Sequence, residues 1–132
     1  MISGARLLFL LGLVVALAPM AAQADEAKTL NGQYIWNFQK EKSGDLEAVF
    51  TPIGDDKWEV AFHFEFNGAG HTYSGTADGS LAEGKLQGKV QNEAKKRTFT
   101  FTGVFEAGEF KGTHAELNSD GEPFDTGTLT LQ

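Results

Sequence analysis

The feature of this sequence that most constrains its fold is an alternation of apolar and polar residues with a period of two. The clearest case is the segment 58–66, whose even positions are all large and apolar: Trp58, Val60, Phe62, Phe64 and Phe66. A period of two sends successive side chains to opposite faces of a sheet, whereas a helix needs a period near 3.6. The pattern therefore predicts a β-strand with one apolar face.

The same alternation recurs along the chain and predicts about eight short strands. They begin near Asn31 and continue through the segments 46–51, 58–66, 71–77, 85–91, 97–105, 109–117 and 126–131. Short connections rich in Gly, Asn and Asp separate them, and such connections favour antiparallel hairpins, because a parallel crossover needs a dozen or more residues. The segment 92–96 is too short for an independent helix, so we expect a turn there. The sequence thus predicts an all-β, antiparallel up-and-down meander.

Two architectures satisfy this pattern. Eight antiparallel strands can close into a barrel, which removes exposed edges, or divide into a two-sheet β-sandwich. Glycines inside the predicted strands, such as Gly75, Gly88, Gly103 and Gly112, are typical of bends and of close backbone approach, which help a sheet to curl. We therefore predict a closed or nearly closed barrel, with the sandwich as the alternative.

Residues 1–24 have the features of a signal peptide. Arg6 precedes the apolar run 7–18, and Ala22-Gln23-Ala24 is a suitable cleavage site. We expect residues 25–132 to form a single exported domain, periplasmic or extracellular. The apolar run is shorter than the roughly 20 residues of a spanning helix, so no membrane insertion is expected after cleavage. The sequence has no cysteine, so disulfides cannot stabilise the domain.

Charge and motif content narrow the classes of function. The chain has 18 acidic and 11 basic residues, a net charge of −7, which repels the phosphates that dominate nucleic-acid affinity. We therefore expect no nucleic-acid partner. There is no cysteine nucleophile, no Gly-x-Ser-x-Gly motif and no recognisable triad setting, so we assign no catalytic residue and predict no cofactor.

The three histidines differ in their predicted direction. His63 alternates with Phe62 and Phe64 and should face solvent, whereas His71 and His114 share the parity of apolar residues on their strands and should face inward. No pair of histidines has the spacing of a metal site, so we predict none. On the same parity we expect Phe64→Ala to cost roughly 3 to 5 kcal/mol of stability and His63→Ala less than about 1 kcal/mol.

The start of the predicted domain, Leu30-Asn31-Gly32-x-Tyr34-x-Trp36, resembles the small calycin-like up-and-down barrels of the lipocalin and avidin type. Those families begin their first strand with Gly-x-Trp. Here Tyr34 stands at the tryptophan position and Trp36 follows two residues later, so no binding residue is carried over. The resemblance implies the barrel architecture and, by analogy of fold, a ligand inside it.

The leading functional hypothesis is non-enzymatic binding of a small apolar or amphipathic molecule inside the barrel. On the expected inner faces, the candidate ligand-binding residues are Trp36, His71, Tyr73 and His114. The main alternative is a structural or protein-interaction module with a solid core, in which aromatic rings only fill the interior: Trp36, Phe62, Phe64, Phe99 and Phe101. A third hypothesis is an enzyme with a carboxylate or histidine site at the barrel mouth. A cavity of ligand size would separate the first two.

Overall fold

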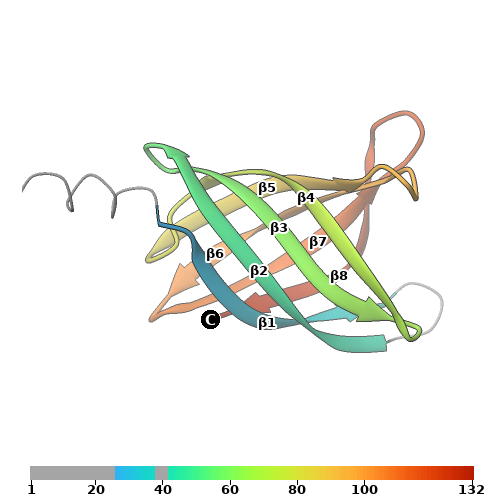
Figure 1. The fold of residues 1–132 in the computed structure, drawn as a ribbon, viewed down its shortest axis with the longest axis horizontal. Coiled ribbons are helices and arrows are strands. Elements are labelled where there is room, and N and C mark those ends of the chain that lie inside the picture. Colours follow the sequence, from blue (N-terminus) through green and yellow to red (C-terminus); the bar gives the residue numbers. More distant parts are fainter. Residues whose placement is uncertain (1–25, 38–41) are drawn as a thin grey trace, which may run out of the picture.

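The computed structural model describes residues 26–37 and 42–132, and the predicted signal peptide lies outside them. The described residues form eight strands: β1 (Lys28–Trp36), β2 (Lys42–Gly54), β3 (Lys57–Phe66), β4 (Ala69–Gly79), β5 (Gly84–Asn92), β6 (Arg97–Glu106), β7 (Glu109–Leu117) and β8 (Pro123–Leu131) (Figure 1). Within these ranges no helix is long and apolar enough to cross a membrane. The predicted all-β fold is confirmed, and every predicted strand is present.

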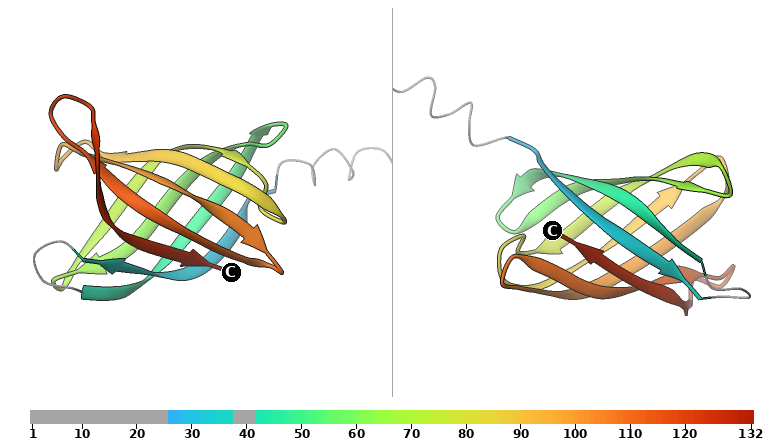
Figure 2. Two further views of the ribbon diagram at one scale, coloured as in Figure 1. Left: turned by 180° about the vertical axis from the view of Figure 1, so that it is seen from behind. Right: turned by 90° about the horizontal axis from the view of Figure 1, so that it is seen from below.

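The eight strands form one closed barrel. Each strand pairs antiparallel with the next, and β1 also pairs with β8, with Gly32 opposite Leu131 and Trp36 opposite Gly127. Figure 2 shows β1 lying between β2 and β8. The predicted up-and-down barrel is therefore confirmed, and the alternative of a two-sheet sandwich is wrong.

The connections between strands divide the barrel into two ends. The β3–β4, β5–β6 and β7–β8 connections lie at the right-hand end in Figure 1, which we call the mouth. The β2–β3, β4–β5 and β6–β7 connections lie at the opposite end, which we call the closed end. Residues 93–96 form a turn between β5 and β6, as predicted.

Strand β3 has the predicted register. Val60 and Phe62 are buried and Phe64 is partly buried, whereas His63 is exposed on the outer surface, where its Nδ1 lies 2.9 Å from Thr72 Oγ1. A shift of one residue would exchange the two faces and expose the aromatic rings. The even positions of β3 therefore face the interior.

The closed end is a solid core. Its largest side chains have almost no exposed surface: Phe50, Leu86, Phe105, Phe110 and Leu131. Gly103 of β6 lies opposite Gly112 of β7, and the ring of Phe110 lies over both. A Cβ on Gly103 would lie 2.3 Å from the Lys111 carbonyl oxygen and 2.7 Å from Phe110 Cζ. The absence of side chains at this pair thus allows the sheet to curl tightly and the ring to fill the space.

Candidate ligand cavity

The half of the barrel nearer the mouth is hollow. A cavity of about 120 Å³ opens toward solvent there. All four candidate residues predicted from the sequence line it: Trp36, His71, Tyr73 and His114. An engineered protein cavity of about 150 Å³ accepts benzene, whereas pockets for whole drug-sized ligands occupy roughly 300 to 1,000 Å³. The cavity can therefore enclose about one ring.

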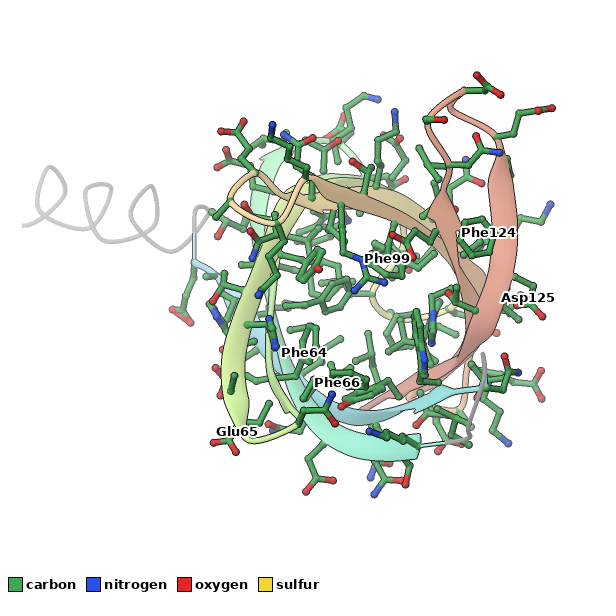
Figure 3. The ribbon with its side chains drawn as sticks, turned by 90° about the vertical axis from the view of Figure 1, so that its right-hand side faces the viewer. Phe64, Glu65, Phe66, Phe99, Phe124 and Asp125 are labelled. Carbon is green, nitrogen blue, oxygen red and sulfur yellow. The ribbon has the colours of Figure 1, made fainter. Side chains whose placement is uncertain are left out.

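Most of the cavity wall is aromatic. Phe62 and Phe101 are buried, with ring centroids 5.1 Å apart in an edge-to-face arrangement. Phe64 stacks on Tyr73 at 5.8 Å and meets Tyr34 edge-on at 5.3 Å. The view into the mouth in Figure 3 shows Phe64, Phe66 and Phe99 on the inner side of the barrel and Glu65 on the outer side. The wall thus offers ring faces and edges to an apolar guest.

The expectation of a solid aromatic core holds for only part of the set. Phe62 and Phe101 are 6% and 3% exposed. Trp36, Phe64 and Phe99 are only partly buried, and they border the cavity. Trp36 and Phe99 meet edge-on with ring centroids 6.2 Å apart, and the cavity lies beside them. The interior is therefore packed at one end and open at the other.

An ion pair lies in the wall near the mouth. Arg97 donates through Nε to Glu116 Oε2 at 2.8 Å and through Nη2 to Oε1 at 2.7 Å, a bidentate arrangement. The guanidinium carbon also lies 5.5 Å from the ring centroid of Trp36 and 5.2 Å from that of Phe99. The hydrogen bond to Glu116 raises the pKa of Arg97, despite partial burial. The pair places a fixed, charge-compensated polar group beside the aromatic wall.

Neither partner of this pair was among the residues proposed from the sequence. Arg97 shares the parity of Phe99 and Phe101 on β6, and Glu116 shares that of His114 on β7. The alternation that predicts inward phenylalanines therefore also predicts an inward arginine. A charged residue at an alternating position that is otherwise occupied by apolar, inward-facing residues therefore indicates a polar group inside a barrel.

Tyr73 of β4 places a hydroxyl at the cavity. The residue is 4% exposed, and within the described part of the chain its hydroxyl forms no hydrogen bond. Among these residues no fully enclosed polar side-chain atom lacks a partner, so the Tyr73 oxygen keeps accessible surface, which faces the cavity that the residue lines. Burial raises the pKa of Tyr73; nearby Arg97 opposes this shift and Glu116 adds to it.

His114 joins three strands. Its Nε2 donates to the Ile35 carbonyl oxygen of β1 at 2.9 Å, and its Nδ1 lies 2.6 Å from the fully buried Thr126 Oγ1 of β8. The β7–β8 register shifts here, which leaves Thr126 as the extra residue of a bulge. A Cβ at Gly127 would lie 2.8 Å from His114 Nε2, so glycine makes room for the ring.

The environment of His114 fixes its role in the wall. Burial lowers its pKa, and the hydrogen bond to Ile35 and the charge of Asp125 oppose this shift. Its ring stacks on Trp36 with centroids 6.3 Å apart and planes 10° apart. Since both nitrogens have protein partners, His114 offers the cavity a ring face, while it holds β7 and β8 against β1.

His71 lies closer to the mouth and has a simpler environment. Its ring stacks on Phe64 at 5.5 Å and meets Phe66 edge-on at 6.5 Å. Among the residues that the structure describes, no group of three His, Cys, Asp or Glu side chains could hold a metal ion. His71 is therefore best described as an aromatic part of the rim.

No family model matches the chain, and no curated protein matches it.

Proposed function

We propose that this protein is a non-enzymatic binding protein that holds one apolar ring, or a hydrocarbon segment of similar size, in the mouth half of its barrel. The observation that carries the proposal is a cavity of about 120 Å³ whose wall is mostly aromatic and otherwise largely aliphatic. Such a wall gives dispersion and hydrophobic contact to an apolar guest, and burial of apolar surface contributes about 25 cal/mol/Å². The barrel architecture also agrees with the resemblance to lipocalin-type and avidin-type barrels.

The size of the cavity limits the ligand. A long acyl chain or a fused polycyclic compound would exceed the space between Phe62, Phe101 and the rim. A larger amphipathic molecule can enter only in part, with its remainder outside the mouth. We therefore propose a small molecule, or the single-ring end of a larger one.

The proposal can be tested by titration with toluene, followed by amide chemical shifts in NMR spectra of residues 25–132. Saturable shifts should gather on residues that line the mouth half. Val90→Phe should abolish them, because Val90 is buried and lines the cavity. The matched control is Val104→Phe, the same exchange at an exposed position outside the cavity, which should bind as the unchanged protein does.

Two results would overturn the proposal: the absence of saturable shifts in the unchanged protein, or full binding by a folded Val90→Phe variant. The first result would favour the solid-core interaction module. If Val90→Phe does not fold, Leu129→Phe offers a second obstruction of the same cavity. Native mass spectrometry of protein purified from its source would then identify a retained molecule.

A further inference from the structure

The cavity contains a polar position that a purely apolar guest would leave unused. Tyr73 is 96% buried, and within the described residues its hydroxyl has no hydrogen-bond partner, although that hydroxyl borders the cavity. The hydroxyl oxygen keeps accessible surface toward the open cavity, so water can reach it while the cavity is empty, and a bound molecule that displaces this water must supply the hydrogen bond instead. Such an atom is satisfied when a bound molecule supplies the partner.

A second donor lies on the same wall. The ring of Phe99 contacts Tyr73 edge-on at 5.5 Å and also lies 5.2 Å below the Arg97 guanidinium. A guanidinium carries five N–H groups, and the bidentate contact with Glu116 uses two of them. Arg97 therefore keeps donors of its own beside the cavity that it lines. The wall thus combines a hydroxyl donor and guanidinium donors, and both residues contact Phe99.

The charge of this wall selects against an ion. Glu116 is only 16% exposed in its side chain and neutralises Arg97 at hydrogen-bond distance. An anionic ligand would lose its hydration in an aromatic cavity and would gain no net attraction from a compensated pair. A cation would meet Arg97 already placed over Trp36 and Phe99, the ring faces that would attract it. A neutral acceptor has neither disadvantage.

We propose that the cavity selects an uncharged single-ring aromatic molecule that carries a carbonyl oxygen, and that this oxygen accepts hydrogen bonds from Tyr73 and Arg97. The inference rests on the proposed function, because it assumes that the ring occupies the cavity. It adds the chemical class of the ligand: an aryl ketone, aldehyde, ester or amide, in preference to the hydrocarbon or the carboxylate of the same shape.

Three probes of nearly equal shape test this inference by the NMR titration described above. They are α-methylstyrene, acetophenone and benzoate. Each has a phenyl ring bonded to one trigonal carbon, which carries a methylene group in the first, a carbonyl oxygen in the second and two carboxylate oxygens in the third. Tyr73→Phe should weaken acetophenone about 5- to 10-fold, the range expected for loss of one neutral hydrogen bond. The same variant should leave α-methylstyrene within about 2-fold, because the ring and its contacts stay in place.

A charge variant gives an independent measurement. The unchanged protein should bind benzoate at least about 10-fold more weakly than acetophenone. Glu116→Gln leaves Arg97 without its counter-charge and should tighten benzoate about 10-fold, while acetophenone changes little. The urea midpoint of each variant shows whether it is folded.

The outcomes separate the two proposals. If no probe binds, the proposed function fails. If α-methylstyrene binds but Tyr73→Phe weakens all probes equally, or none, the cavity binds rings without recognising the oxygen and this inference is overturned. It is also overturned if the unchanged protein prefers benzoate to acetophenone, since the wall would then be an anion site.

Discussion

Truncation of consecutive residues on β3 tests how the barrel interior changes from solid to hollow. Phe62 is 6% exposed and contacts Phe101, so Phe62→Ala should cost about 4 kcal/mol, as buried phenylalanine truncations do. From sequence alone we expect a similar loss for Phe64→Ala. The structure lowers that figure, because Phe64 is only partly buried and borders the cavity.

The magnitude for Phe64 follows from the two terms of such a truncation. One is the transfer of the ring from its buried site, about 1.5 to 3 kcal/mol for a fully buried phenylalanine. The other is the creation of a new void, which adds to the loss in a closed core. Beside an existing open cavity the new space merges with the old, so the second term is small. We expect Phe64→Ala to cost about 2 kcal/mol.

Urea unfolding of three single variants decides the matter, with His63→Ala as the matched control on the outer face. His63 is exposed, and its side chain makes a hydrogen bond with Thr72 on the outer surface, so its loss should change stability by less than about 1 kcal/mol. The order of losses should be Phe62, then Phe64, then His63. A loss for Phe64 equal to that for Phe62 would mean that the mouth half is solid, and a large loss for His63 would mean that the register is wrong.

Three further predictions concern single contacts. Arg97→Met leaves the Glu116 carboxylate unpaired and should cost about 1 to 2 kcal/mol in urea unfolding, a loss largely restored when Glu116 is also replaced by Met. Gly103→Ala should cost more than about 3 kcal/mol because its Cβ meets backbone, whereas Gly70→Ala, with nothing within 4 Å of the added Cβ, should change stability by less than about 0.5 kcal/mol. Because burial lowers the folded pKa of His114, the unfolded chain takes up this proton first as the pH falls. The contribution of His114 to stability should therefore be complete above about pH 6.5 and should decline as the pH falls toward its folded pKa. His114→Gln should lack this decline. Equal slopes of unfolding free energy against pH for the two proteins would contradict the prediction.

The strands could be predicted from sequence because a period of two fixes which side chains share a face. The same rule placed His63 outside and His71, Tyr73 and His114 inside, and the structure confirms those directions. The rule does not say how many strands close the sheet, because a sandwich presents the same alternation. Closure depends on the pairing of β1 with β8, which lie almost a hundred residues apart in the chain.

The cavity itself could be predicted only in part. Parity identifies inward residues, including Arg97, but it does not say whether inward rings meet across the barrel. The bulge that turns Thr126 toward His114 has no distinctive residue pattern, since it arises from the mismatch between β7 and β8. The two protein partners of His114, and thus its structural role, follow from that bulge.

The packed core and the open cavity lie at opposite ends of this barrel. At the closed end Phe105 and Phe110 are fully buried, with ring centroids 5.5 Å apart, and leucines fill the remaining space. At the mouth Trp36, Phe64 and Phe99 are partly exposed, and the Arg97 guanidinium lies over the rings of Trp36 and Phe99. Substitutions at the rim therefore remove less buried surface than those at the closed end. Tyr73→Phe removes one hydroxyl from a buried ring and Glu116→Gln keeps the size of the side chain, so both variants should test the proposed recognition at modest cost in stability.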